Sequence, residues 1–263
     1  MKAMDTATTG SDFDVLLSDG STAHVRDIAP SDAEALRQFH ASLSTRSIVM
    51  RYFSPHPTLS DKEIERFTNV DCIDRVALVV NRGGCIVAVA RYDRSPGSDE
   101  AEVAFVVQDE FQGLGLGTIL LEHLATIARR HGIRRFTADT LSENRRMLGV
   151  FRDAGFARRY SRASEVVQVV LDITPSAAAL AAAAEHGIEV IDIRTAAEVA
   201  ARPAGARHIP MQDLLANPGL LSVGRQALLV CATGKRSRAA ALALRERGLA
   251  VRSLAGGLQN MER

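Results

Sequence analysis

The segment that most constrains the fold joins an apolar run to a glycine-rich turn and then to a long helical stretch. It reads EAEVAFVVQDEFQGLGLG from Glu100 to Gly117 and continues as TILLEHLATIARRHG. The apolar run predicts a strand, and the stretch after the turn predicts a helix that ends at Gly132, a residue type suited to a left-handed cap. Glu100 and Glu102 share one face of the strand because side chains alternate with period two. The unpaired N–H groups at the helix start can bind a phosphate group.

Composition limits the class of protein. The chain has 263 residues, 46% of them hydrophobic, and a formal net charge of +1, so no overall charge points to nucleic acid or to an anionic membrane as a partner. No apolar run approaches the roughly 20 residues of a membrane helix, and the polar start is not typical of a signal peptide. Three widely spaced cysteines fit reduced thiols, with no metal-ligand spacing. We therefore expect a cytoplasmic protein.

The order of the predicted elements indicates two domains of different construction, α/β overall. In the first, the β-rich runs RVALVV, CIVAVARY and EVAFVV are separated by Gly83-Gly84 and by Ser95-Pro-Gly-Ser98, which predicts a largely antiparallel sheet. After Pro175, short strands alternate with helices, which predicts a small parallel sheet. The expected boundaries are a flexible tail over 1–19, a first domain over 20–174 and a second over 175–263.

The glycine turn by itself has more than one interpretation. It could be a plain strand–helix turn, or it could bind a dinucleotide. The dinucleotide fingerprint G-x-G-x-x-G, counted from Gly113, requires glycine where this chain has Thr118. Asp139 lies at a suitable distance along the chain to bind a ribose, which keeps this alternative open. Against it, the fingerprint should open a β–α–β unit, whereas this turn follows three strands that look antiparallel.

Several motifs together resemble the GNAT-type N-acetyltransferases. They are Gln112-x-x-Gly115-x-Gly117, Glu102 on the preceding strand, Asn144, and Gly155-Phe156. The blocks VRDIAPSDAEALRQFHASLSTRSIVMRYF, DCIDRVALVV, AEVAFVVQDEFQGLGLG and SENRRM resemble the acetyltransferase domain of bacterial protein-lysine acetyltransferases over 20–174. The resemblance implies that acetyl-CoA binds with its pyrophosphate on the turn, and that the preceding strand diverges from its neighbour to pair with pantetheine. The residues that would bind the cofactor are then Val107, Gln112, Gly113, Leu114, Gly115, Leu116, Gly117, Thr118 and Asn144.

The chemistry of amine acetylation requires a base, and Glu102 is the natural candidate. An attacking lysine has a pKa of about 10.4 and is an ammonium ion at neutral pH, so it must lose a proton before it attacks a thioester. A partly desolvated Glu102 would accept that proton directly or through a water, Glu100 would help to attract the cation, and a backbone N–H near Val106 would meet the oxyanion. The next helix carries Phe151 and no tyrosine, so the proton donor for the thiolate is unassigned. Glutamates also occur on solvated strands, and Asn144 could be a helix first-turn residue alone.

A second candidate site is the loop Cys231-Ala232-Thr233-Gly234-Lys235-Arg236, between a predicted strand and a predicted helix. Loop amides, a helix N-terminus and two cationic residues would stabilise a thiolate there. The alternative is a buried cysteine that ends a strand. With VIDIR, TAAEVAA and LAGGL, this loop resembles a single rhodanese domain over 177–263, which implies that Cys231 accepts sulfane sulfur as a persulfide. Cysteine phosphatases have one more residue between Cys and Arg, and the tighter ring suits one sulfur atom.

The rhodanese resemblance has two departures. Residues 201–204 read ARPA where the family has a glycine-histidine-isoleucine, and the chain ends at QNMER, where the family commonly continues with an aromatic residue and a helix. The fold is therefore more strongly indicated than sulfur turnover. Asp192 and Arg194 match a strand-end pair with a structural role.

The combined prediction is an acetyl-CoA-dependent N-acetyltransferase fused to a rhodanese-like sulfur-carrier domain. The acceptor would be a protein lysine, with a small-molecule amine as the alternative, and the second domain would take sulfur from a sulfane-sulfur donor. In a second alternative, that domain is a non-catalytic docking or sensing module.

Overall fold

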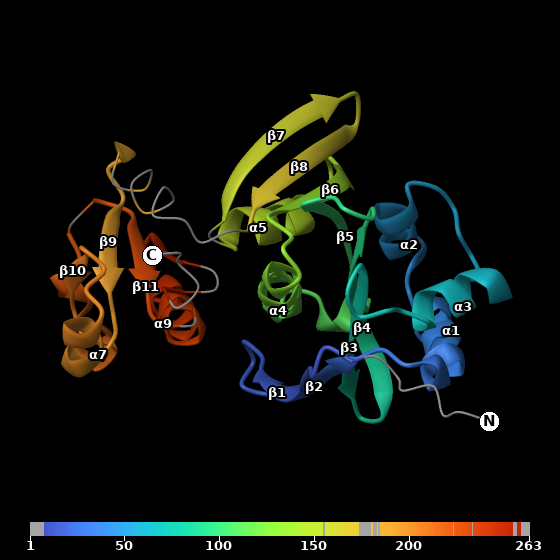
Figure 1. Ribbon diagram of the computed structural model, residues 1–263, viewed down its shortest axis with the longest axis horizontal. Coiled ribbons are helices and arrows are strands. Elements are labelled where there is room, and N and C mark those ends of the chain that lie inside the picture. The colour runs from blue at the N-terminus through green and yellow to red at the C-terminus, as the bar shows by residue number, and fades with distance from the viewer. Residues whose placement is uncertain are drawn as a thin grey trace. The chain divides into compact units, whose positions relative to one another are not determined.

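The computed structural model describes residues 8–154, 156–173, 180, 183, 185–222, 224–232, 234–254 and 257–258 (Figure 1). The chain divides into two compact units, Met1–Val150 with Arg159–Val170 and Phe151–Arg158 with Leu171–Arg263. The predicted boundary between residues 174 and 175 lies outside the described residues, so it stays a proposal. Each unit is described by itself. Within the described parts of the chain, no helix combines the length and the apolar character that crossing a membrane requires.

The first unit is built on a mixed sheet of eight strands in the order β1-β2-β3-β4-β5-β6-β8-β7. Neighbours from β1 to β5 are antiparallel, and β5 pairs with β6 in parallel. The mixed, largely antiparallel sheet predicted from the three β-rich runs is therefore confirmed. The strands are β1 (Asp12–Leu16), β2 (Thr22–Asp27), β3 (Arg75–Arg82), β4 (Cys85–Arg94), β5 (Glu100–Val107), β6 (Arg135–Leu141), β7 (Ala157–Ala163) and β8 (Val166–Asp172).

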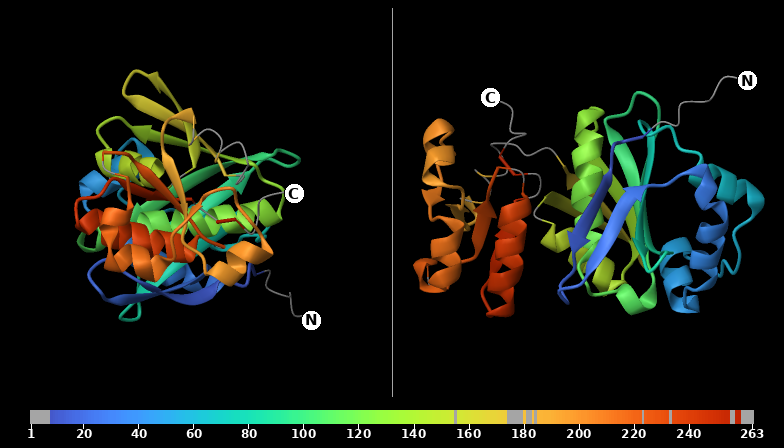
Figure 2. Two further views of the ribbon diagram at one scale, coloured as in Figure 1. Left: turned by 90° about the vertical axis from the view of Figure 1, so that its left-hand side faces the viewer. Right: turned by 90° about the horizontal axis from the view of Figure 1, so that it is seen from below.

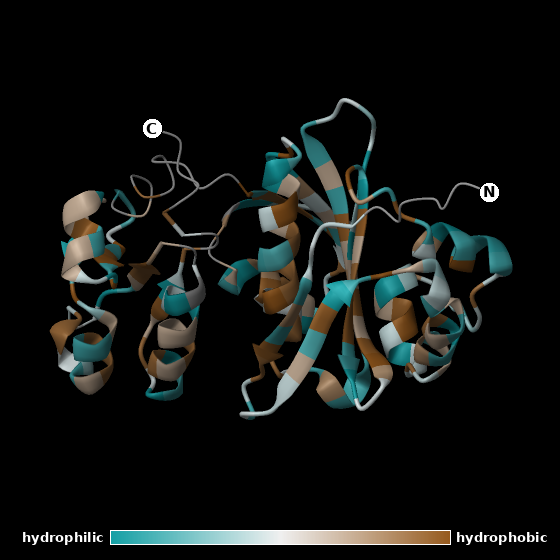
Figure 3. Cartoon of the chain, turned by 60° about the horizontal axis from the view of Figure 1, so that its bottom comes forward, coloured by the Kyte–Doolittle hydropathy of each residue, from teal (hydrophilic) through white to brown (hydrophobic). Residues whose placement is uncertain are grey.

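The central hairpin β3–β4 forms where the sequence predicts a tight connection. Gly83 and Gly84 have φ values of +58° and +82°, which only glycine adopts at little cost. Arg82 pairs with Cys85, so the turn has two residues. Both strands are buried along most of their length, and Figure 3 shows that hydrophobic residues dominate these central strands. Burial on both faces explains why their apolar runs are continuous rather than alternating.

Helices cover both faces of this sheet. The helices α1 and α2 pack on β4 and β5 from one side, α3 packs on α1, and α4 packs on β3, β4 and β5. Figure 2 shows α4 on the face opposite the N-terminal helices. The elements are η1 (Pro30–Asp32), α1 (Ala33–Ala41), α2 (Thr45–Tyr52), α3 (Asp61–Thr68), η2 (Asp109–Phe111), α4 (Leu116–Arg130) and α5 (Arg145–Asp153).

The predicted flexible tail over 1–19 is too long. Residues 12–16 form β1, which pairs along its whole length with β2. The connection is a turn in which the Asp19 carboxylate accepts hydrogen bonds from the N–H and hydroxyl of Ser21, and Gly20 has a φ of +81°. Polar turn residues with a left-handed glycine are typical of a hairpin, so the sequence carried this signal.

The second unit contains a four-stranded parallel sheet in the order β10-β9-β11-β12, which confirms the predicted parallel arrangement. Its core includes Ile191, Leu229 and Leu244, all fully buried. The first helix of the strand–helix alternation predicted after Pro175, residues 176–186, lies largely outside the described residues. The elements are β9 (Glu189–Asp192), α7 (Ala196–Ala201), β10 (Arg207–His208), α8 (Met211–Ala216), η3 (Pro218–Leu220), β11 (Ala227–Val230), α9 (Lys235–Glu246) and β12 (Val251–Ser253).

Candidate functional site

The strands β5 and β6 diverge after a short shared segment. Their parallel pairing covers three residue pairs, Glu100–Arg135, Ala101–Phe136 and Glu102–Thr137. Strand β5 continues to Val107 and β6 to Leu141, while β5 stays paired with β4 as far as Val107. Between residues 103 and 107, the β6 side of β5 has no strand partner among the described residues. An extended ligand can pair with a strand edge of this kind.

Glu102 is the last residue of β5 in that ladder, and its side chain is exposed. The expected partial desolvation is not present in the protein alone, so any desolvation of this carboxylate has to come from bound substrates. Glu100 forms an ion pair with Arg135. Its charge is therefore offset within the protein, and the expected role of attracting a cationic substrate is weakened.

The glycine turn has the backbone geometry that an anion site needs. Gly113 and Gly115 have φ values of +85° and +87°, and Gly115 is the N-cap of α4. In the described part of the chain, the N–H groups of Gly113 and Leu114 donate no hydrogen bond to a protein acceptor. The first N–H groups of a helix also have no intrahelical acceptor, and they form its positive end. These amides suit a diphosphate.

Gly117 is required for a different reason. Its φ is not positive, but a Cβ added there would lie 3.0 Å from Cγ2 of Val150 on α5. The first turn of α4 therefore approaches α5 more closely than a side chain at this position allows. The three glycines of the motif thus serve two physical needs, a left-handed backbone at 113 and 115 and helix–helix contact at 117.

Gln112 and Asp109 fix the turn to its surroundings. Gln112 Nε2 donates to the Val107 carbonyl and to Ser47 Oγ, both at 3.0 Å, and its Oε1 accepts from Arg146 on α5. The Asp109 carboxylate accepts from the N–H and hydroxyl of Ser44 and from the Ser47 hydroxyl. Burial alone would raise the pKa of Asp109, but these hydrogen bonds bring the pKa below its usual value.

A pocket lies on the face of β4 and β5 that the N-terminal helices cover. Ala104 and Val106 line it from β5, and they share a face with Glu102 because they follow it at two-residue steps. Val106, near which the sequence analysis places an oxyanion donor, is therefore at the pocket and beyond the end of the β5–β6 ladder. Other lining residues are Phe39, His40, Arg51, Tyr52, Phe67 and Arg91.

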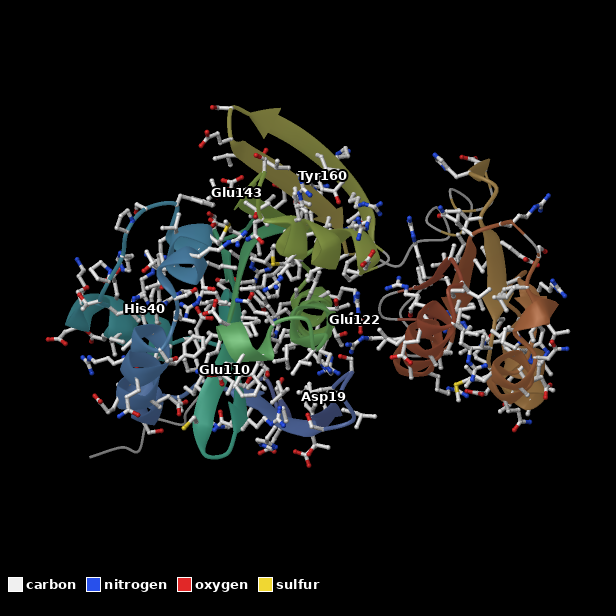
Figure 4. All side chains as sticks on the ribbon, turned by 180° about the vertical axis from the view of Figure 1, so that it is seen from behind. Asp19, His40, Glu110, Glu122, Glu143 and Tyr160 are labelled. Atoms are coloured by element: carbon white, nitrogen blue, oxygen red, sulfur yellow. The ribbon has the colours of Figure 1, made fainter. Side chains whose placement is uncertain are left out.

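Sequence reasoning missed the polar residues of this pocket. His40, labelled on α1 in Figure 4, is 3% exposed and its Nε2 lies 2.7 Å from the His56 carbonyl oxygen. The Tyr52 ring stacks on His56 at 4.3 Å between centroids, and burial raises the pKa of Tyr52. Arg91 is 8% exposed. The one signal in the sequence is an arginine placed within the apolar run CIVAVARY.

Two further predicted positions on the next helix have structural explanations. Asn144 Oδ1 accepts the Met147 N–H at 3.1 Å, and the Asn144 carbonyl accepts from Leu148 N–H, so this residue caps α5, as the alternative interpretation allowed. Phe151, which occupies the place of an expected acid, is 1% exposed and has no proton to donate. Gly155 lies outside the described residues.

One argument against dinucleotide binding was wrong. The turn follows antiparallel strands, as predicted, but β5, α4 and β6 also form a β–α–β crossover with parallel pairing. What separates the turn from the dinucleotide fingerprint is Thr118 at the sixth position and a parallel ladder that ends after three residue pairs.

The second candidate site is built around Cys231, which directly follows β11 and is fully buried. Its Sγ accepts hydrogen bonds from the N–H of Gly234 at 3.2 Å and from the N–H and hydroxyl of Ser237 at 3.4 and 3.5 Å. These donors are at the start of α9, where the helix dipole also favours negative charge. Such surroundings stabilise a negatively charged sulfur.

The Cys231 loop is held from two sides. Arg236 forms an ion pair with Glu198, which lowers the pKa of Glu198 to about 2. Gly257 has a φ of +62°, and a Cβ there would lie within 2.5 Å of the Ala232 and Cys231 carbonyl oxygens. This close approach explains a glycine of the LAGGL motif. Thr233 lies outside the described residues, and the same is true of the Lys235 side chain.

Asp192 and Arg194 form a buried pair at the end of β9. Arg194 donates to both carboxylate oxygens of Asp192 and to the Arg202 carbonyl, and the Asp192 and Arg194 side chains are 1% and 4% exposed. A pair enclosed in this way positions the loop after β9 and is not accessible to a substrate.

Comparison with known proteins gives matches to two families. Residues 43–156 match the acetyltransferase (GNAT) family, and residues 176–263 match the rhodanese-like domain. A crystal structure of the GNAT domain of S. lividans PAT is 46% identical; the match covers 61% of this chain and 96% of that one, with a TM-score of 0.59. Acetyltransferase PA5475 of Pseudomonas aeruginosa is 29% identical over 144 residues, 53% of this chain and 77% of that protein. Acetyltransferase Pat of Mycolicibacterium smegmatis is 32% identical over 132 residues, 49% of this chain and only 39% of that protein's length.

Proposed function

Because residues 43–156 belong to the GNAT acetyltransferase family and residues 176–263 to the rhodanese-like domains, the chain is an acetyl-CoA-dependent N-acetyltransferase, and we propose that it acetylates lysine side chains of proteins. The observation that carries the proposal is the end of the β5–β6 ladder at Glu102. Glu102 lies there between the edge of β5 that has no strand partner among the described residues and the pocket that Ala104 and Val106 line. The resemblance to bacterial protein-lysine acetyltransferases, which runs over 20–174, supports lysine as the acceptor.

In the proposed mechanism, the turn and the strand edge hold acetyl-CoA. The N–H groups of residues 113–118 would receive the diphosphate, since those of Gly113 and Leu114 have no protein acceptor in the described part of the chain and the start of α4 adds its positive end. Pantetheine would run along β5 near Val107, where the β6 side has no strand partner. The thioester would then lie close to Val106. The strand edge without a partner and the amides of the turn support this placement.

Glu102 would act as the base in this mechanism. The acceptor ammonium transfers one proton to Glu102, directly or through a water, and the neutral amine then attacks the thioester carbon. As the C–S bond breaks, the second amine proton passes, directly or through solvent, to the departing thiolate, which leaves as the free thiol. A thiolate leaves readily, so the absence of a tyrosine on α5 does not prevent the reaction. Bound substrates would cover the exposed carboxylate and make it a stronger base.

For the second domain, we propose that Cys231 carries sulfane sulfur. Three hydrogen-bond donors converge on its Sγ, and Arg236 lies in the same loop, an arrangement that favours thiolate attack on a sulfane-sulfur donor. The three cysteines are all among the described residues and form no disulfide, which supports a reducing compartment such as the cytoplasm.

The test of the proposed acceptor compares protein and small-molecule amines. Purified full-length chain, acetyl-CoA and a panel of cellular proteins are incubated, and acetylation is followed by intact mass; polyamines and free amino acids form the second arm. We expect transfer to particular protein lysines that is lost in Glu102→Gln. Turnover of small amines with no protein acetylated would show that the alternative, a small-molecule acetyltransferase, is correct.

A further inference from the structure

The pocket beside Glu102 contains a buried cation. Arg91 lies in the middle of β4, where its register partners are Ala77 on β3 and Ala104 on β5. Small neighbours on both sides leave room for its long side chain under the N-terminal helices. The side chain lines the pocket but is 8% exposed. A guanidinium placed like this has lost most of its hydration, which costs free energy unless an anion compensates.

Arg91 has weak compensation within the protein. Its guanidinium carbon lies 4.1 Å from the centre of the Phe67 ring, and one N–H reaches the Phe67 carbonyl at 3.4 Å. In the part of the chain that the structure describes, no carboxylate lies within 4.0 Å of it. Asp93, two residues along the same strand, pairs instead with Arg75 at 3.2 Å.

The pocket is cationic under ordinary conditions. Burial lowers the pKa of Arg91 to about 10, which still leaves the guanidinium protonated at neutral pH. Arg51 lines the same pocket from α2. On α3, Glu63 is held by the Ser60 N–H and hydroxyl and lies 3.0 Å from His56 Nε2. Two arginines therefore line a cavity that has no carboxylate among its described lining residues.

Arg91 lies close to the proposed base. Glu102 pairs in register with Asp93 and Ala104 pairs with Arg91, so Arg91 is the diagonal neighbour of Glu102 on the same face. Diagonal neighbours on adjacent strands have Cα atoms about 7–8 Å apart. An acceptor whose amine is at Glu102 can therefore place an anionic group at Arg91 if the two groups lie close together in space.

We propose that Arg91, with Arg51, forms a carboxylate-binding subsite that selects amine acceptors carrying an acidic group near the amine. The inference rests on the proposed acetyltransferase site at Glu102 and specifies its acceptor. A guanidinium binds a carboxylate through two parallel N–H···O bonds. The carboxylate is supplied by an Asp or Glu side chain beside the acceptor lysine or by the α-carboxylate of a free amino acid.

The experiment measures kcat/KM of the full-length chain with acetyl-CoA and matched acceptors. One pair of lysine peptides differs only by Glu against Gln next to the lysine, and a second pair is Nα-acetyl-lysine against its amide. We expect the acidic member of one pair to react about 10-fold to 100-fold faster, because a hydrogen bond to a charged group is lost in the neutral one. The pair that shows the preference identifies the source of the carboxylate.

Variants tie that preference to the arginine. Arg91→Gln should abolish the discrimination and Arg91→Lys should keep part of it, while the exposed Arg134→Gln serves as a matched control with the preference unchanged. The two wild-type pairs need no variant, so misfolding of Arg91→Gln does not remove the test. Equal rates within both pairs would overturn the inference. It would also be overturned if the chain reacted faster with succinyl-CoA than with acetyl-CoA and showed no preference between the acidic and neutral acceptors.

Failure of the inference can be told apart from failure of the proposed function. If neutral and acidic lysine peptides react equally and Glu102→Gln is inactive, the acetyltransferase site stands and only the carboxylate subsite is wrong. If no lysine peptide or protein is acetylated while another amine is, the proposed protein-lysine function itself is wrong.

Discussion

Glu102 of β5 pairs with Thr137 of β6, and this pair is the last of the ladder between the two strands. Beyond it β5 follows β4 alone for five more residues, Val103 to Val107. The position of Glu102 at this fork gives it an exposed side chain on the face that Ala104 and Val106 line. The predictions below begin with this carboxylate.

Replacing Glu102 with Gln should slow acetyl transfer by about 100-fold or more, because proton removal by a positioned base contributes on that scale. The residual activity should rise with pH beyond the wild-type plateau, since the variant depends on amine that is already neutral and lysine has a pKa of about 10.4. The measurement is a pH–rate profile with acetyl-CoA and a lysine acceptor.

Glu110→Gln is the control for that experiment. Glu110 is an exposed residue of η2 on the segment that leads into α4 (Figure 4), so its profile should match the wild type. A Glu102→Gln variant with an unchanged profile would assign the base to another residue.

Gly117→Ala should destabilise the first unit by about 1–3 kcal/mol, as overpacked sites do, because the new methyl group would lie 3.0 Å from Val150 Cγ2. It should also raise KM for acetyl-CoA by shifting the start of α4. The double variant Gly117→Ala with Val150→Ala removes the clash and should recover both the unfolding midpoint and KM. Recovery of stability without recovery of KM would show that Gly117 is needed for cofactor binding itself.

The sequence predicted those parts of the site that depend on local patterns. The hairpin at Gly83-Gly84, the strand over 100–107 and the turn before α4 each follow from residues that are neighbours in the chain. Arg91 did not stand out, because its pocket exists only where β4 meets Ala77 and Ala104 from two other strands and where the N-terminal helices cover that face. The residue pattern around Arg91 in the chain carries no information about these long-range contacts.

The same reasoning explains the error at β1 and why the argument against dinucleotide binding overlooked the β5–α4–β6 crossover. Asp12–Leu16 is short and acidic, and it becomes a strand only because β2 offers it a partner. The parallel pairing of β6 with β5 depends on how α4 crosses the sheet. Neither partner can be identified from the segment itself, although the polar turn at Asp19-Gly20 was a usable local signal for the first.

The two cysteines of the first unit, Cys72 and Cys85, should differ in reactivity as they differ in burial. Burial raises the pKa of the Cys72 thiol to about 11, and Cys85 is exposed at the β3–β4 hairpin. A thiolate-directed reagent at neutral pH should therefore label Cys85 first and Cys72 only on unfolding. Peptide mapping after a time course measures this order, with Cys85→Ser as the control. Early labelling of Cys72 in the folded protein would contradict the prediction.

Glu198 should make the second unit sensitive to acid. Arg236 lowers its folded pKa from the ordinary 4.5 to about 2, so the ion pair contributes stability fully above pH 4.5, and this contribution is lost as the pH falls toward 2. The effect is modest because about a third of each side chain is exposed. Thermal unfolding at pH 7, 5 and 3 should show a smaller fall of the unfolding midpoint with pH in Glu198→Gln than in the wild type.

The control is Glu246→Gln. Glu246 is an exposed residue at the end of α9, so this variant should behave as the wild type. Parallel acid curves for Glu198→Gln and the wild type would mean that the Arg236 pair does not stabilise the fold, and that its role is confined to holding the guanidinium beside Cys231.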